Sequence, residues 1–153
     1  MKISVQNEPF DYGELSNHFV QGHRHVGAVV TFCGIVRDDV HGDLSTMEIE
    51  HYPGMTEKAI KAHAHTAKDR FSLSDVLVIH RYGSLAPGEM IMMVATAAPH
   101  RHDAFQGAEF LMDYLKSRAP FWKKEIVDGH ARWVDANQKT KMPFHGGDLF
   151  FGG

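Results

Sequence analysis

The stretch from Met112 to Glu125 contains residue types suited to holding a flat, anionic molecule. Its sequence, M-D-Y-L-K-S-R-A-P-F-W-K-K-E, mixes four cations with three aromatic rings: Lys116, Arg118, Lys123 and Lys124 with Tyr114, Phe121 and Trp122. Lysine and arginine supply charge and hydrogen-bond donors, and aromatic rings supply faces for stacking. The alternative is a helix end whose cations only complement the helix dipole, and the pattern by itself does not separate the two.

Two further groups of residues are candidates for anion binding. Arg37 follows an apolar, β-branched run, and His100 and Arg101 stand where a helix is expected to begin. Arg37 has the alternative of a solvated charge at a strand end, and the pair has the alternative of a polar helix start. Because an arginine at a helix N-terminus opposes the dipole, Arg101 indicates an anion held at that position.

Other chemistries find less support. Cys33 lies among apolar neighbours in what we expect to be a buried central strand, where a free cysteine is usually an inert hydrophobe. The twelve histidines include three His-x-His pairs, but none has a third ligand at motif spacing, and residues i and i+2 of a helix point to different sides. Nucleophile elbows, phosphate loops and dinucleotide fingerprints are missing from the sequence. We therefore expect no metal and no cofactor.

Composition places these residues in an ordinary globular protein. The 153 residues carry a net charge of −3, and 43% of them are hydrophobic. A chain of this length usually forms one domain that buries about 70% of its unfolded surface. The sequence pI of about 6.4 argues against broad nucleic-acid binding, so the basic cluster is a local feature.

The sequence also predicts a cytoplasmic location. The longest apolar run, Met90–Ala98, is far shorter than the roughly 18 residues that a membrane span needs. The first residues, M-K-I-S-V-Q-N-E-P, lack the apolar core of a signal peptide. The single cysteine excludes an internal disulfide framework and is typical of a reducing compartment.

Hydrophobic periodicity predicts strands alternating with helices. Strands are expected at Lys2–Val5, Gly27–Val36, Ser45–His51, Asp75–Arg81, Met90–Ala98, Glu125–Val127 and Ala131–Val134, and helices at Asp11–Val20, Met55–Phe71 and Arg101–Ala119. The continuous hydrophobicity of 75–81 and 90–98 predicts strands covered on both faces. Hairpins mixed with helical crossovers favour an α+β fold, with a catalytic domain over 1–135 and a tail over 136–153.

Five segments in order resemble the family of large, catalytic subunits of molybdopterin synthase. They are V-V-T-F-C-G-I-V-R at 29–37, E-H-Y-P-G-M-T-E-K-A at 50–59, V-I-H-R-Y-G at 78–83, A-P-H-R at 98–101 and F-L-M-D-Y-L-K-S-R-A-P-F-W-K-K-E at 110–125. The resemblance covers about residues 26–134. The second and fifth segments are specific enough to make chance a poor explanation.

The resemblance implies an α/β-hammerhead-like α+β fold, with a mixed or antiparallel sheet, two long helices and a C-terminal β-hairpin. It implies a homodimer in which each subunit binds a small ubiquitin-like sulfur-carrier subunit, giving a heterotetramer. The implied reaction converts cyclic pyranopterin monophosphate into molybdopterin by inserting two sulfurs as a dithiolene. Each sulfur arrives on the thiocarboxylated C-terminal glycine of the small subunit.

Carried over position by position, the resemblance assigns catalytic roles to Lys116 and Lys123. It assigns substrate binding to seven further residues: Ile35, Val36, Arg37, His100, Arg101, Lys124 and Glu125. Arginine and lysine suit the cyclic phosphate, because a guanidinium can grip two oxygens at once. Many members have lysine at the position of Ile35, so either the backbone makes that contact or another cation replaces it.

Two other functions fit the same residues, and the C-terminal tail suggests a hypothesis of its own. The same residues fit a module that binds a nucleotide or pterin without chemistry, and the histidines fit an uncharacterised metal hydrolase. The chain ends in Phe150-Phe151-Gly152-Gly153, and the family's small subunit also ends in Gly-Gly. We hypothesise that this tail occupies the channel for the small subunit's tail, while packing of the two phenylalanines on a surface groove is the alternative.

Overall fold

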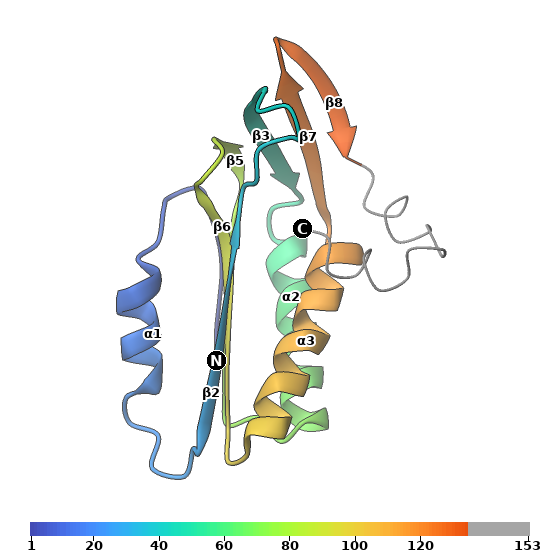
Figure 1. Ribbon diagram of the computed structural model, residues 1–153. Helices are drawn as coiled ribbons and strands as arrows, with labels where there is room; N and C mark the ends of the chain where they lie inside the picture. Colours follow the sequence, from blue (N-terminus) through green and yellow to red (C-terminus); the bar gives the residue numbers. More distant parts are fainter. Residues whose placement is uncertain (135–153) are drawn as a thin grey trace, which may run out of the picture.

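The computed structural model describes residues 1–134, so the tail and the hypothesis about its last four residues lie outside the described residues (Figure 1). Eleven elements follow in order: β1 (Lys2–Gln6), α1 (Tyr12–Val20), β2 (Ala28–Ile35), β3 (Leu44–His51), α2 (Met55–Arg70), β4 (Asp75–Arg81), β5 (Gly83–Leu85), β6 (Met90–Ala98), α3 (Arg101–Ser117), β7 (Phe121–Val127) and β8 (His130–Val134). None of the described helices is long and apolar enough to cross a membrane.

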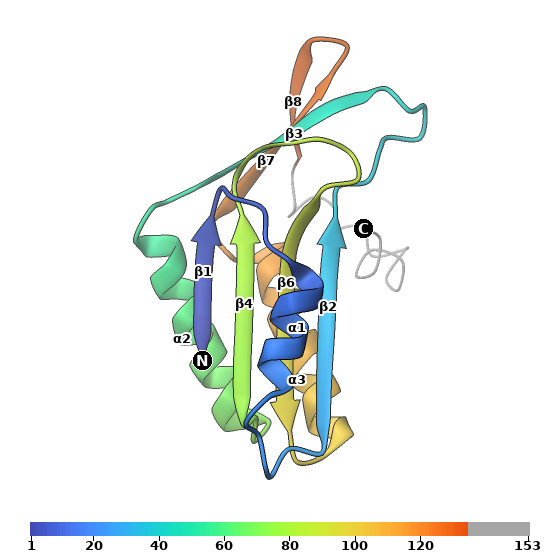
Figure 2. The same cartoon turned by 90° about the vertical axis from the view of Figure 1, so that its left-hand side faces the viewer.

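The first sheet has the strand order β1-β4-β6-β2, with β1 parallel to β4 and the other pairs antiparallel. Helix α1 lies on one face, and α2 and α3 lie on the other (Figure 2). Side chains of β4 and β6 alternate between two apolar clusters, one under α1 and one under α2 and α3. This confirms the prediction that both faces of these strands are covered.

The second sheet is antiparallel, with the order β5-β3-β7-β8, and lies at the end of the first sheet where β4 finishes (Figure 2). A small apolar cluster of Val36, Leu44, Ile49 and Leu85 fills the space between the sheets. The chain leaves the first sheet after β4, forms β5 at the edge of the second, and returns as β6. The two sheets and three helices confirm the α+β class.

Several predicted boundaries differ from the structure around the basic cluster. Strand β7 begins at Phe121, four residues before the predicted Glu125, because Phe121 packs into the core between the sheets. Helix α3 ends at Ser117 rather than Ala119, since the amides of Arg118 and Ala119 both bond to the carbonyl of Tyr114. The segment Gly83–Leu85, expected to be a connection, is strand β5.

The position of Cys33 was predicted wrongly. Its strand, β2, stands at the edge of the first sheet and pairs only with β6 among the described strands, and most of its residues are half-buried. Hydrophobic runs do not distinguish central from edge strands when helices cover both faces. Burial nonetheless raises the pKa of the Cys33 thiol, which agrees with an inert side chain.

A buried imidazole joins the two sheets. His80, near the end of β4, stacks on Phe121 at the start of β7, with ring centroids 3.8 Å apart and an interplanar angle of 17°. Its Nδ1 lies 2.8 Å from the carbonyl oxygen of Arg81, so Nδ1 is the donor and Nε2 carries no proton. Burial above all, then the charges of Lys123 and His51, lowers the pKa of His80 to about 3.

Acid should therefore weaken the fold through His80. Its pKa is lower in the folded than in the unfolded state, so the unfolded chain takes up the proton and stability falls as the pH drops below about 6.5 towards 3. We expect urea unfolding between pH 6.5 and 5 to show a slope of up to about 1.4 kcal/mol per pH unit from this group.

The His80→Phe variant keeps the ring stack and cannot titrate, so its slope should be clearly smaller. His63→Phe is a matched control: His63 also stacks on aromatic rings, but it is only half-buried and its pKa is lowered less than that of His80, so its removal should change the slope less. A slope unchanged by His80→Phe would contradict this account of the junction.

Candidate active site at the junction of the two sheets

Lys116 and Lys123 flank the turn that links α3 to β7. Lys116 lies in the last turn of α3 and is exposed, and Lys123 is the third residue of β7 and is half-buried. Between them, the helix has already ended at Ser117, Pro120 lies in the turn, and the amide of Phe121 donates to the carbonyl of Ala119. Figure 1 shows the C-terminal end of α3 next to the start of β7, so the two elements that carry these lysines meet at the second sheet.

Lys123 faces the junction rather than the outer surface of the second sheet. It pairs in register with Ile49, which is 1% exposed and belongs to the cluster between the sheets. Phe121, two residues earlier and therefore on the same face, stacks on His80. The charge of Lys123 is also a cause of the lowered pKa of His80. The site therefore sets a cation beside a neutral imidazole.

Lys124 faces the other way. Its Nζ lies 3.2 Å from Glu48 Oε2 and 5.1 Å from the centre of the Trp133 ring. Adjacent residues of a strand point to opposite faces, so these contacts direct Lys124 away from the Lys123 side. The structure thus separates two lysines that the sequence places side by side.

Glu125 shares the face of Lys123 but is already paired. Its Oε1 lies 3.1 Å from Nη2 of Arg132, the residue opposite it on β8. The Glu125 side chain is 18% exposed and that of Arg132 is 72% exposed, so the ion pair lies at the rim of this face. Sequence reasoning did not single out Arg132, although the Asp128-Gly129 hairpin fixes this register.

The segment Ile35–Arg37 reaches the same junction from β2. Val36 is 2% exposed and packs in the cluster that contains Ile49, the register partner of Lys123. Ile35 is 55% exposed, Arg37 is also exposed, and the ladder between β2 and β6 shifts register at Gly34 and Ile35. The structure therefore places Val36 in the same cluster as the register partner of Lys123, and Arg37 is the exposed residue that follows Val36.

His100 and Arg101 lie at the opposite end of α3. His100 is the N-cap residue without a side-chain cap bond, and both side chains are exposed. Helix α3 runs unbroken from Arg101 to Ser117, so Arg101 and Lys116, 15 positions apart, are separated by roughly 22 Å along its axis. One protomer does not bring His100 and Arg101 together with the two lysines.

The described residues contain no group of three or more His, Cys, Asp or Glu side chains that could hold a metal ion. Sequence reasoning also missed His80, Arg81 and Glu89, which lie next to the candidate site. The signal was present in V-I-H-R-Y-G, where two polar residues follow four buried apolar residues and end the strand. Buried polar residues need partners, so such positions carry information.

The sequence comparisons agree on one family. The family model described as MoaE protein matches residues 5–118. A molybdopterin synthase catalytic subunit from Cereibacter sphaeroides is 60% identical over 138 residues, covering 90% of this chain and 94% of the relative. A protein of the same description from Caulobacter vibrioides is 45% identical over 141 residues, covering 92% of this chain and 93% of the relative.

Solved structures share the fold. The molybdopterin biosynthesis MoaE protein from Burkholderia ambifaria has a TM-score of 0.76 and 47% identity, covering 88% of this chain and 89% of that one. Molybdopterin synthase from Staphylococcus aureus has a TM-score of 0.78 and 29% identity, covering 86% of this chain and 95% of that one. These matches confirm the resemblance that the five sequence segments indicated: the chain belongs to the MoaE family, the catalytic subunits of molybdopterin synthase.

Proposed function

We propose that this chain is the sulfur-transferring catalytic subunit of a molybdopterin synthase that acts in the cytoplasm in molybdenum cofactor biosynthesis. It converts cyclic pyranopterin monophosphate into molybdopterin by inserting two sulfurs as a dithiolene. The observation that carries the proposal is the 60% identity to a molybdopterin synthase catalytic subunit over 90% of the chain. The cations gathered at the sheet junction suit an anionic, ring-shaped substrate.

The sulfur donor is a small ubiquitin-like subunit with a thiocarboxylated C-terminal glycine. A structure of similar fold from Helicobacter pylori is described as a complex of subunits 1 and 2 of molybdopterin-converting factor, with a TM-score of 0.74 and 19% identity. Two copies of the present chain and two small subunits form the working heterotetramer. A thiocarboxylate end is anionic, so it is attracted to a site that contains Lys116 and Lys123.

The two lysines supply the catalytic groups. When a thiocarboxylate gives up its sulfur, negative charge develops on oxygen and protons must move, and an ammonium group serves both needs. Lys123 is half-buried beside the neutral imidazole of His80, where electrostatic interactions are stronger than in water. Lys116 is exposed in the last turn of α3, so its ammonium group suits the first contact with an incoming anion.

Substrate binding falls to the residues around the lysines. The Arg37 guanidinium suits the cyclic phosphate. The buried side chain of Val36 anchors the backbone just before Arg37 at the junction. With isoleucine at position 35, either the backbone of this turn contacts the substrate or another cation takes the place of the lysine side chain. Glu125 borders the Lys123 face, whereas Lys124 is committed to Glu48 on the other face and has a lesser role.

Turnover is the direct test of this function. The purified chain, mixed with a thiocarboxylated small subunit and cyclic pyranopterin monophosphate, should form molybdopterin. A module that only binds pterins would bind the substrate without product, and a metal hydrolase would lose its activity on treatment with a chelator. Either result would contradict the proposal.

Single substitutions should separate the three lysines. We expect Lys116→Ala and Lys123→Ala each to lower turnover about a hundredfold or more, the usual effect of losing an acid–base group. Lys124→Ala should lower it far less, because that side chain points to the opposite face. Melting temperatures measured beside the rates show whether each variant is folded. A folded Lys116 variant with the wild-type rate would refute that assignment.

Mixing inactive subunits should test whether each site is shared between protomers. Because α3 holds Arg101 and Lys116 roughly 22 Å apart, a small pterin phosphate reaches both only if they come from different chains. We expect Arg101→Ala and Lys116→Ala homodimers to be inactive, and their mixture to recover part of the activity through heterodimers. Mass spectrometry would verify subunit exchange. Full exchange without any recovery would rule out a shared site.

A further inference from the structure

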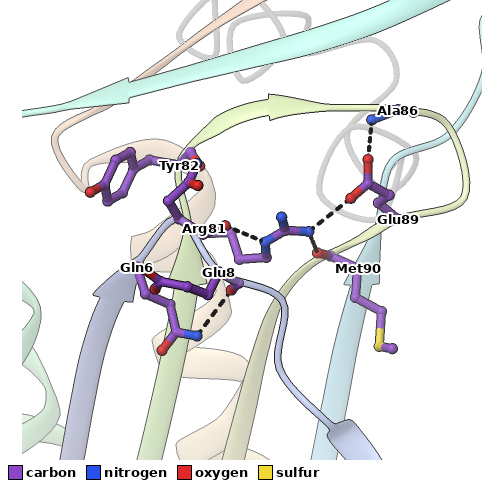
Figure 3. Close-up of polar contacts among 8 residues, drawn as sticks. Gln6, Glu8, Arg81, Tyr82, Ala86, Glu89 and Met90 are labelled. Atoms are coloured by element: carbon purple, nitrogen blue, oxygen red, sulfur yellow. Dashed lines mark hydrogen bonds and ion pairs between the residues drawn. The ribbon is translucent and has the colours of Figure 1, made fainter.

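Arg81 and Glu89 form an ion pair at the place where the chain leaves the first sheet and returns to it. Arg81 ends β4 and is 6% exposed, and Glu89 immediately precedes β6. Arg81 Nη1 lies 3.1 Å from Glu89 Oε1 and 3.4 Å from the carbonyl oxygen of Met90, and Arg81 Nε donates to the carbonyl of Asn7 at 3.0 Å (Figure 3). The guanidinium therefore ties together the segments that follow β1 and β4 and precede β6.

The carboxylate of Glu89 shapes the loop between β5 and β6. Its second oxygen, Oε2, accepts a hydrogen bond from the amide of Ala86 at 2.7 Å, and the Glu89 amide donates to the Ala86 carbonyl at 3.1 Å. The Ala86 bond and then the Arg81 bond lower the pKa of Glu89, so the carboxylate remains ionised at neutral pH. Both oxygens of one side chain are thus used to fix a four-residue turn.

This turn in turn holds the backbone of Val36. The Val36 amide donates to the Glu89 carbonyl at 2.9 Å, and the Gly88 amide donates to the Val36 carbonyl at 2.8 Å. Both backbone groups of Val36 are therefore bonded to the turn that Glu89 braces. Arg37 is the next residue, and its exposed side chain starts from this fixed point.

We propose that Arg81 and Glu89 are positioning residues for substrate binding: their ion pair braces the 86–89 turn, and the turn fixes the backbone from which Arg37 reaches the cyclic phosphate. The inference rests on the proposed function, in which Arg37 binds that phosphate. The competing explanation is that the ion pair only stabilises the fold. The two explanations differ in whether the effect of Glu89 passes through Arg37.

The Glu89→Gln variant loosens the turn with little change in shape. Arg81 and Ala86 donate to different carboxylate oxygens, and the amide NH2 that replaces one of them cannot accept, so one of the two bonds is lost. We expect the KM for cyclic pyranopterin monophosphate to rise about tenfold while kcat stays within about threefold, because misplaced binding groups are costly even at a distance.

Asp75→Asn is the matched control. Asp75 begins the strand that Arg81 ends, and its carboxylate is paired with the chain's amino group at 3.1 Å and with His23 at 3.3 Å. That carboxylate lies roughly 20 Å along the strand from Arg81, so its loss should leave both constants unchanged. Arg81→Lys serves as a second variant of the brace, since an ammonium cannot reproduce the separate Nε and Nη1 contacts.

A double-mutant cycle decides between the two explanations. In an Arg37→Ala background, Glu89→Gln should change KM by less than about twofold, because the group that it positions is already gone. An equal effect of Glu89→Gln in both backgrounds would overturn the proposal, as would a lower melting temperature with an unchanged KM. A fully active Arg37→Ala variant would overturn it as well, while leaving the synthase activity itself established.

Discussion

The fold depends on the double-sided burial of β4 and β6. Their side chains are buried on both faces, against α1 on one side and α2 and α3 on the other. Such strands leave no face for polar chemistry, so charged residues collect where strands and helices end. Arg81, His80 and Val36 all lie at the end of the first sheet that meets the second, and Lys123 joins them because β7 begins there. The candidate site is a consequence of where the apolar layers stop.

The composition of that junction explains how one lysine can differ from its neighbour. Phe121 and the buried His80 and Ile49 line the inner face of β7, and the imidazole remains neutral because burial opposes its protonation. A charge placed there interacts more strongly with an incoming anion than the same charge in water. Lys124, one residue further, is compensated by Glu48 and stacked on Trp133. Strand alternation therefore divides two identical side chains between an inner site and an ordinary surface ion pair.

Sequence patterns predicted the element types, and the family segments indicated the candidate site, because both rest on short-range signals. The continuous apolar runs at 75–81 and 90–98 specified covered strands, and the five family segments located Arg37, Lys116 and Lys123. The strand of Cys33 was predicted to be central but lies at the sheet edge. Strand order depends on long-range pairing, which local hydropathy does not encode. The brace of Arg81 and Glu89 was missed for a similar reason. Its partners include the carbonyl of Asn7, which is 74 positions away in the chain.

The placement of Arg101 gives a physical reason for an assembly larger than one chain. A cation in the first turn of a helix opposes the dipole and costs about 0.3–1 kcal/mol. Within residues 1–134, Arg101 forms no ion pair that offsets this cost, and its side chain is exposed. The straight helix also keeps it away from the lysines of its own chain. The proposed site shared between protomers accounts for an arginine that is unfavourable in the isolated protomer and distant from the lysines of its own chain: an anion bound at a neighbouring subunit would be stabilised by the same guanidinium.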